Sequence, residues 1–304
     1  MNDGANRSVS SPFAIIRALR PAQWTKNAVV FAAFLFALGD PQQEIGLAHG
    51  WLVLMAALCF CLLSSAVYLL NDVRDRELDR LHPTKKLRPI AAGAVSVQAA
   101  LVLAAVLATL ALLAAFWIQP ALAHVLIAYA VIQLLYSLGL KRVALLDVFV
   151  IAGGFVLRAL AGAVTLEVEI SPWLLLCTLL LALFLALCKR RHEKVVLANL
   201  GASARDSMRA YDERLLDQLI AIVSAATIVC YALYTLWPDT VAKFGTAKLG
   251  FTIPFVLFGI FRYLDLVYRH DKGGEPEKIL LTDGPLLIDL ALYGLCVAVV
   301  IFLS

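Results

Sequence analysis

Residues 47–79 read LAHGWLVLMAALCFCLLSSAVYLLNDVRDRELD, so an apolar run passes directly into a highly charged one. The apolar part, residues 47–70, is long enough to cross a bilayer, for which a helix needs about 20 residues. Polar side chains begin at Asn71 and continue through Asp79. The stretch therefore predicts a membrane helix that ends in a charged site at the membrane surface.

The composition extends this prediction to the whole chain. Hydrophobic residues make up 62% of the sequence and charged residues only 16%, which is unlike a soluble protein. Apolar runs suited to membrane helices occupy residues 27–38 (with a polar lead-in from residue 13), 47–70, 94–117, 121–140, 143–164, 171–188, 214–237, 247–268 and 285–303. We therefore predict an all-α polytopic membrane protein with nine transmembrane helices, forming a single membrane-embedded domain over residues 1–304.

The distribution of Lys and Arg predicts the orientation of these helices. Basic residues gather in the N-terminal segment and in residues 71–93, 189–213 and 269–284, whereas the opposite loops hold only Lys243 and Lys248. Because cytoplasmic loops carry an excess of Lys and Arg, we predict a cytoplasmic N-terminus, an external C-terminus and an active site facing the cytoplasm from the inner (plasma) membrane. The net charge of +4 reflects this basic side, and it does not indicate binding to nucleic acid.

The acidic end of the 47–79 stretch predicts a metal site. Asn71, Asp75 and Asp79 are spaced four and four, which places three oxygen-bearing side chains on one face of a helix. Oxygen ligands suit Mg²⁺, which usually keeps part of its coordination shell free for substrate phosphates. Asp72 lies one residue off this face and is a second-choice ligand or an outer-shell group. The alternative is a solvated segment whose acids pair with its own arginines.

Basic residues near this motif are candidates for phosphate binding. Arg74 lies off the ligand face, and Lys85 and Arg88 follow in a connection that two prolines keep from being helical. Their side chains could bind phosphate oxygens, and the alternative is ordinary positive-inside charge. Lys26 opens the first predicted span, either as a phosphate contact or as a base that snorkels to the interface.

A second charged segment joins the 171–188 and 214–237 runs. Lys189 and Arg190 follow the first run, and Asp212 and Asp217 lie at the start of the second. The two acids could form a second metal cluster. Their five-residue separation does not place them on one helical face as well as four would, and Asp212 could equally cap a helix.

Arg158 lies deep inside the 143–164 run, eleven positions beyond Asp147. Eleven residues are close to three helical turns, so both side chains point the same way. A charge at that depth must face the bundle interior or a water-filled cavity, and is a candidate for function. A structural salt link to another helix is an equal alternative.

The N-x-x-x-D-x-x-x-D element (Asn71, Asp75, Asp79) within nine helices resembles the UbiA superfamily of intramembrane prenyltransferases. Within that superfamily the sequence is most similar to the decaprenyl-phosphate phosphoribosyltransferases. Four stretches carry this second likeness: residues 19–27 (LRPAQWTKN), 68–75 (YLLNDVRD), 81–91 (LHPTKKLRPIA) and 189–193 (KRRHE). The chain departs from the superfamily's usual second D-x-x-x-D, because Asp212 and Asp217 are one residue too far apart.

The resemblance implies a UbiA-like bundle that transfers 5-phosphoribose from phosphoribosyl diphosphate to a polyprenyl (decaprenyl) phosphate, with Mg²⁺ as cofactor. It also implies a role in making a lipid-linked arabinose donor for cell-wall polysaccharide. The expected metal ligands are Asn71, Asp75 and Asp79, and the expected catalytic residues are Asp72, Asp75 and Asp79. The expected substrate-binding residues are Lys26, Arg74, Lys85, Arg88, Tyr136, Lys141, Arg158, Lys189, Arg190, Asp212 and Asp217.

Two alternatives stay open at this stage. The first is a UbiA-type prenyltransferase that moves an isoprenoid from its diphosphate to an aromatic or glyceryl acceptor. The second is a transporter for an anionic solute, which is disfavoured because transporters place charges near the midplane and here only Arg158 lies deep. The expected partners are phosphoribosyl diphosphate, polyprenyl phosphate and the lipid bilayer. The sequence leaves the oligomeric state open, including a homo-oligomer.

Overall fold

The computed structural model describes residues 11–40, 43–82, 84–169, 171–200, 211–270, 272–274 and 276–303. Within these ranges the chain is helical and contains no strand. The α-helices are α1 (Pro12–Ala18), α2 (Ala32–Leu38), α3 (Gly50–Arg74), α4 (Arg76–Leu81), α5 (Val97–Ile118), α6 (Pro120–Leu138), α7 (Leu146–Leu166), α8 (Pro172–Leu200), α10 (Glu213–Leu236), α11 (Pro238–Phe244), α12 (Ile253–Arg269), α13 (Pro276–Thr282) and α14 (Gly284–Leu303). Short 3₁₀ helices are η1 (Pro21–Phe31), η2 (Leu47–His49), η3 (Lys85–Leu87), η4 (Leu140–Arg142) and η5 (Lys248–Thr252).

Eight segments of the described chain are long and apolar enough to span a membrane. They correspond to eight of the nine predicted spans, so the prediction of an all-α protein is confirmed, with eight helices capable of crossing a membrane. The first predicted span differs in form, because residues 21–31 adopt the 3₁₀ conformation and only α2 continues as an α-helix. Gln23, Lys26 and Asn27 make this part of the segment polar. Nine spans and a cytoplasmic N-terminus therefore stay predictions.

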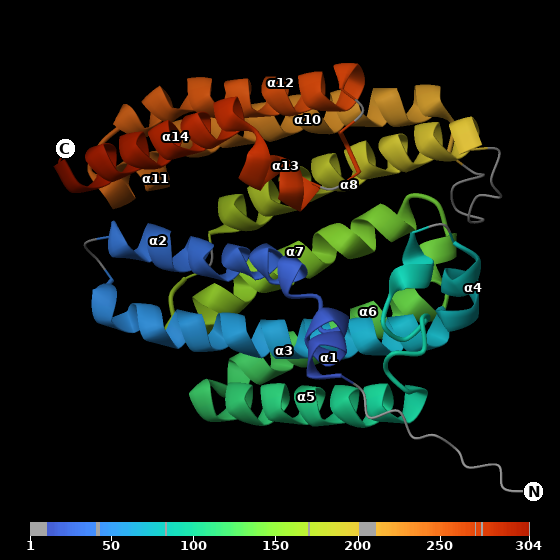
Figure 1. The fold of residues 1–304 in the computed structure, drawn as a ribbon. Coiled ribbons are helices and arrows are strands. Elements are labelled where there is room, and N and C mark those ends of the chain that lie inside the picture. The colour runs from blue at the N-terminus through green and yellow to red at the C-terminus, as the bar shows by residue number, and fades with distance from the viewer. Residues whose placement is uncertain are drawn as a thin grey trace, which may run out of the picture.

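The helices form two layers that meet at α7 and α8 (Figure 1). The first layer buries side chains from η1, α2, α3, α5, α6 and α7, and the second buries side chains from α7, α8, α10, α12, α13 and α14. Helix α7 contributes to both cores, with Val148 and Ala152 in the second and Ala161 and Leu166 in the first. Helix α7 therefore belongs to both layers.

A glycine allows η1 to lie directly against α7. A Cβ atom on Gly162 would come within 2.0 Å of the carbonyl oxygen of Val30, so a side chain at this position would push η1 away. Four residues earlier on the same face, Arg158 donates a hydrogen bond to Asn27 of η1 at 2.7 Å. The glycine therefore serves helix packing, as expected for small residues in membrane bundles.

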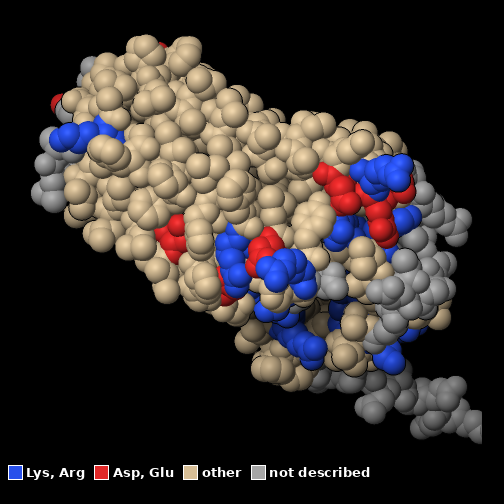
Figure 2. Space-filling model, turned by 90° about the horizontal axis from the view of Figure 1, so that it is seen from above, with Lys and Arg blue, Asp and Glu red and all other residues tan. Residues whose placement is uncertain are grey.

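Charged side chains gather at one end of the molecule. In the view of Figure 2 most blue and red atoms lie from the lower centre to the right end, one blue patch lies at the left end, and tan atoms cover most of the remaining face. This end carries the α3–α4 junction, while the opposite end carries the ion pair between Lys243 of α11 and Asp40, at 3.0 Å. Helix α8 also continues beyond the predicted span, so Lys189 and Arg190 lie on a helix. Residues 201–210 of the predicted 189–213 segment lie outside the described residues.

Candidate active site

The acidic motif crosses the junction between α3 and α4. Asp75 is the single residue between the two helices. Its N–H donates to the carbonyl of Asn71 at 2.9 Å, and the N–H of Asp79 donates to the carbonyl of Asp75 at 2.8 Å. Both bonds are of the i to i−4 type that an α-helix uses. The helical hydrogen-bond pattern therefore continues from Asn71 through Asp75 to Asp79, across the junction between the two helices.

Asn71 and Asp75 form contacts with the end of α6 and with η4, on the side of the molecule that is predicted to face the cytoplasm. The hydroxyl of Ser137 donates to the side-chain oxygen of Asn71. The ammonium of Lys141, in η4, donates to both carboxylate oxygens of Asp75, at 2.9 and 2.8 Å. The structure thus brings the predicted substrate-binding residue Lys141 into the acidic motif. The contact of Ser137 with Asn71 and the contact of Lys141 with Asp75 each join residues that are 66 positions apart in the sequence.

Asp72 and Asp79 meet a pair of arginines. Both carboxylates are buried, at 2% and 4% exposure. One nitrogen of Arg88, Nη1, lies 3.2 Å from Asp72 and 2.6 Å from Asp79, so the guanidinium bridges them. Arg20 donates to the same oxygen of Asp72. A buried carboxylate is stable when it is paired and hydrogen-bonded, and Asp72 here orients two guanidinium groups.

Arg20 is a site residue that sequence reasoning did not select. It adopts a left-handed backbone, with φ of 55°, in the bend between α1 and η1. Its guanidinium also lies over the ring of Tyr68, 5.1 Å from the centroid. The signal in the sequence that could have identified Arg20 is its position in the 19–27 stretch, in which only Lys26, at the start of an apolar run, is predicted to bind phosphate.

The donor chemistry of the motif fits Mg²⁺. Asn71, Asp75 and Asp79 offer only oxygen ligands, which this hard cation prefers. In the described part of the chain, however, no three His, Cys, Asp or Glu side chains are grouped closely enough to hold a metal ion. Lys141 and Arg88 instead neutralise Asp75 and Asp79. A metal bound here would have to compete with these two cations for the carboxylates.

Other predicted residues lie around this centre. Arg74 donates to the carbonyl of Leu138 at 3.1 Å, which ties α3 to α6. Lys26 is half-buried in η1, and Lys85 is half-buried at the start of η3. Glu77, at the surface of α4, accepts hydrogen bonds from its neighbours Arg76 and Arg80, which hold the pKa of its carboxyl below the ordinary value.

A second charged cluster at the same end is almost completely buried. Asp147, in the first turn of α7, is 0% exposed and accepts from Arg190 of α8 at 2.8 Å. It also accepts from the hydroxyl of Tyr211 at 2.7 Å and from the N–H of Val148 at 2.9 Å. Burial, and then the hydrogen bond to Asp147, raise the pKa of the Tyr211 phenol well above its ordinary value.

This second cluster joins three helices and a connection. Arg190 also donates to Glu193, one helical turn away, and to the hydroxyl of Tyr136 on α6 at 3.3 Å. The predicted substrate-binding residues Tyr136 and Arg190 therefore lie together, but around Asp147. From the sequence, Asp147 serves only to define the helical face of Arg158, and no role is predicted for Asp147 itself. The signal that could have identified it was an acid in the first turn of an apolar helix.

The predicted second acidic pair is not brought together with the motif. Asp217 accepts from Arg191 at 2.7 Å and from the hydroxyl of Tyr268 at 2.8 Å. Asp212 occupies the N-cap position of α10 but its side chain makes no capping hydrogen bond, and it is exposed. Neither residue of the predicted second pair therefore contacts the acidic motif between α3 and α4.

Arg158 is buried in the middle of the first layer. Besides Asn27, it donates to the carbonyl of Gly154 at 2.8 Å and to the hydroxyl of Tyr129 at 3.0 Å. Its guanidinium also lies 4.8 Å from the centroid of the Tyr129 ring and 5.3 Å from that of Phe155. No carboxylate pairs with it among the described residues. The contacts explain how a charge is held at this depth, and they link α7 to η1 and α6.

Comparison with known proteins places this geometry in context. Residues 26–194 match the sequence model of the UbiA prenyltransferase family. The chain is 37% identical over 287 residues to a protein of Mycolicibacterium smegmatis named decaprenyl-phosphate phosphoribosyltransferase, covering 90% of this chain and 88% of that one. A protein of the same name from Corynebacterium glutamicum is 36% identical over 298 residues, covering 95% of this chain and 87% of the relative.

The fold has a solved counterpart. A UbiA homolog from Archaeoglobus fulgidus, in a structure with DMAPP and Mg²⁺ bound, superposes with a TM-score of 0.71 at 21% sequence identity. The likeness covers 96% of this chain and 100% of the other. At this level of identity the comparison shows a shared fold, and the sequence relatives carry the closer relationship.

Proposed function

Because this chain belongs to the UbiA prenyltransferase family, and is a transferase of that family, we propose that it transfers 5-phosphoribose from phosphoribosyl diphosphate to a polyprenyl phosphate such as decaprenyl phosphate. The bond between ribose C1 and the diphosphate oxygen breaks, and a bond between C1 and an oxygen of the lipid phosphate forms. One observation carries the proposal: the acidic motif is bordered by Arg20, Arg88 and Lys141, which suits a donor with more phosphate than a simple prenyl diphosphate. The names of the relatives support the same substrates.

Asn71, Asp75 and Asp79 are proposed to hold Mg²⁺. When bound, the metal would stabilise the negative charge that develops on the departing diphosphate. Lys141 and Arg88 already lie on these carboxylates, so each would be released to bind phosphate oxygens when the metal is present. Asp72 would keep Arg88 and Arg20 aimed at the site. This exchange makes the cations part of the binding site for the donor.

The lipid acceptor needs little from the protein besides position. A polyprenyl phosphate is an anion at neutral pH, so no general base is required to activate its oxygen. The protein's task is to hold this oxygen near C1 of the ribose, because correct orientation alone removes much of the barrier to a two-substrate reaction. Lys26, Lys85 and Lys189 are proposed as further contacts to the two phosphorylated substrates.

The cellular setting is also a proposal. The concentration of basic residues at the end that carries the motif supports a site that faces the cytoplasm from the plasma membrane. A soluble, highly charged donor would then reach the site from the cytoplasm, while the acceptor would arrive through the bilayer. The product would serve as a precursor of a lipid-linked arabinose donor for cell-wall polysaccharide.

The test is an assay with the full-length protein in lipid nanodiscs. Labelled phosphoribosyl diphosphate and decaprenyl phosphate are supplied with Mg²⁺, with EDTA, and with EDTA followed by excess Mg²⁺. We expect a labelled lipid whose mass is that of a phosphoribosylated decaprenyl phosphate, no product with EDTA, and recovery when Mg²⁺ is restored. A parallel reaction supplies a prenyl diphosphate with 4-hydroxybenzoate. Product in that reaction alone would refute the proposal and favour the UbiA-type prenyltransferase.

A further inference from the structure

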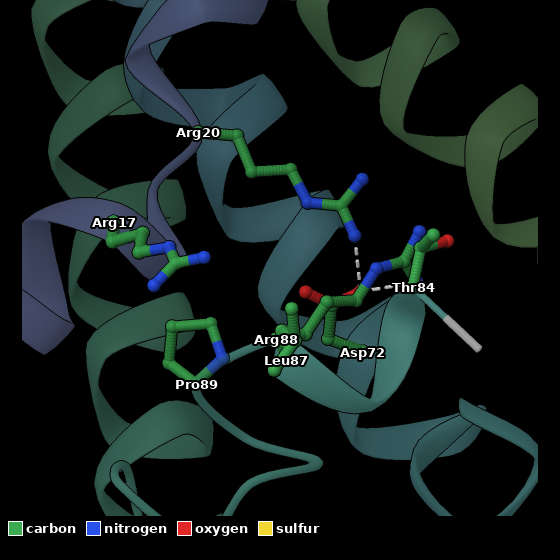
Figure 3. A pocket seen from close by; sticks show the side chains of 7 residues that line it. All are labelled: Arg17, Arg20, Asp72, Thr84, Leu87, Arg88 and Pro89. Atoms are coloured by element: carbon green, nitrogen blue, oxygen red, sulfur yellow. Dashed lines mark hydrogen bonds and ion pairs between the residues drawn. The ribbon is translucent and has the colours of Figure 1, made fainter. Parts of the chain in front are cut away.

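A small basic cavity lies beside the acidic motif, on the side of Asp72 that faces α1. Its volume is about 190 Å³, and its lining residues are Arg17, Arg20, Asp72, Thr84, Leu87, Arg88 and Pro89. Figure 3 shows the guanidinium groups of Arg17 and Arg20 pointing into the same space, with Arg20 and Arg88 joined to Asp72. Three guanidinium groups therefore surround a space about the size of a phosphate group and its first linked atoms.

The charges of this cavity are not balanced by its own residues. Asp72 is shared between Arg20 and Arg88, and Arg88 also pairs with Asp79. Arg17 is exposed, and its side chain makes no hydrogen bond or ion pair within the described part of the chain. The cavity thus presents one unpaired guanidinium beside two that are held in position by a buried carboxylate. Such preorganised guanidinium groups bind phosphate oxygens well.

Exposed apolar side chains accompany the basic residues of the cavity. Phe13 and Ile16, on the same helix as Arg17, are 75% and 56% exposed, and Leu87, which lines the cavity, is 61% exposed. A short helix with exposed apolar side chains beside a basic one is typical of a segment that lies in the headgroup region of a bilayer. A soluble sugar phosphate would gain nothing from these side chains, whereas a lipid with a phosphate head would contact both parts.

We propose that this cavity binds the phosphate head of a membrane lipid, with Arg17 on that phosphate, Arg20 and Arg88 between it and the phosphates of the donor, and Phe13, Ile16 and Leu87 against the first carbons of the chain. Two lipids share this chemistry, namely the polyprenyl phosphate that the proposed function requires and an anionic phospholipid. In the first case the cavity is where the acceptor is held next to the acidic motif, and only that case rests on the proposed function.

The experiment compares Arg17→Gln with a matched control. Arg142→Gln removes an exposed arginine from the same end of the molecule, where it too makes no ion pair with described residues. Native mass spectrometry of the intact protein measures binding of three lipids: decaprenyl phosphate, phosphatidic acid and phosphatidylcholine. Loss of one charge-assisted contact should weaken binding of a phosphate monoester about tenfold, or about 1.4 kcal/mol. Arg142→Gln should match the wild type, and Arg17→Lys should recover most of the binding.

The outcomes separate the two lipids. Weaker binding of decaprenyl phosphate, together with a raised KM for this lipid and an unchanged KM for phosphoribosyl diphosphate, supports the acceptor. Weaker binding of phosphatidic acid with unchanged kinetics supports a phospholipid site. Wild-type binding of both lipids by Arg17→Gln would overturn the proposal, as would a raised KM for phosphoribosyl diphosphate alone. The binding measurement does not require turnover, so it stands even if the proposed function fails.

Discussion

Two charged clusters lie at the same end of this protein, and they differ in how completely their charges are paired. Around the acidic motif the pairs are partly open: side-chain exposure is 28% for Arg88 and 22% for Asp75. Around Asp147 the pair is closed, at 0% for the carboxylate and 6% for Arg190. The same residue types therefore serve two purposes, and accessibility distinguishes them.

The difference has a physical reason. A partly exposed ion pair is weaker than a buried one, because water reaches at least one partner, so a metal or a phosphate can replace that partner. A buried pair can open only by leaving a charge in a medium of low dielectric constant, which is strongly unfavourable. We infer that the open cluster is the one that exchanges partners with substrates, and that the closed cluster holds α6, α7 and α8 together.

The largest expected effect is on activity, from Asp79→Asn. This change keeps the size of the side chain but removes the charge that a metal needs, so we expect kcat to fall about a thousandfold, or about 4 kcal/mol. The measurement is formation of labelled lipid by the purified variant. Folding is checked by its elution profile and helical content, which should be those of the wild type. Activity within tenfold of wild type would contradict the metal role.

A smaller effect, on stability, is expected from Asp147→Asn. The variant removes the buried carboxylate that pairs with Arg190 and leaves only the partly exposed Glu193 as its acidic partner, which should lower the free energy of unfolding by about 2 kcal/mol. Unfolding in mixed micelles with increasing dodecyl sulfate measures this. Asp212→Asn, at an exposed carboxylate, is the matched control and should leave stability unchanged. If Asp147→Asn were as stable as wild type but inactive, the closed cluster would belong to the reaction centre.

Lys141→Gln should change the metal requirement rather than the fold. In the structure the ammonium of Lys141 occupies both oxygens of Asp75, so its removal frees the carboxylate. We expect the Mg²⁺ concentration for half-maximal activity to fall about fivefold, which corresponds to about 1 kcal/mol for a partly exposed pair. Lys86→Gln, an exposed cation of η3, should leave it unchanged. An increased Mg²⁺ requirement in Lys141→Gln would show that the two cations do not compete.

The smallest effect is expected from Glu77→Gln, at the exposed edge of the open cluster. The pKa of Glu77 is lowered by hydrogen bonds from Arg76 and Arg80, so its contribution to stability is complete at neutral pH. That contribution would be lost only as the pH falls through the lowered folded-state pKa. Because water screens these pairs, we expect no measurable change in thermal unfolding at pH 7. A clear destabilisation would mean that α4 depends on its surface charges.

Sequence patterns predicted the local features of this protein well. The apolar runs correspond to membrane helices, the four-and-four spacing of Asn71, Asp75 and Asp79 persists across a helix junction, and the deep charge of Arg158 faces the interior. Each of these follows from neighbours within a few turns, which is the information that periodicity contains.

Partners far apart in the sequence were not predictable in this way. Arg190 and Asp147 are 43 positions apart, and Tyr211 and Asp147 are 64 apart. Spacing cannot show which of several basic residues will meet a given acid, since the choice is made by how the helices pack. The close packing of η1 on α7 was not predictable from spacing either, although Gly162 leaves the room that it needs.

The contact of η1 with α7 bears on how the protein is made. Asn27 and Arg158, which are joined by a hydrogen bond, are 131 positions apart. A ribosome releases η1 long before α7 has been synthesised, so Asn27 and Val30 reach their final neighbours only after α7 has entered the bilayer. Arg20, which directly precedes η1, is part of the acidic centre. We therefore expect a nascent chain stopped before α7 to hold η1 only through α3, to which Trp24 and Asn27 also bond, so that the packing around this arm of the centre is completed late in biosynthesis.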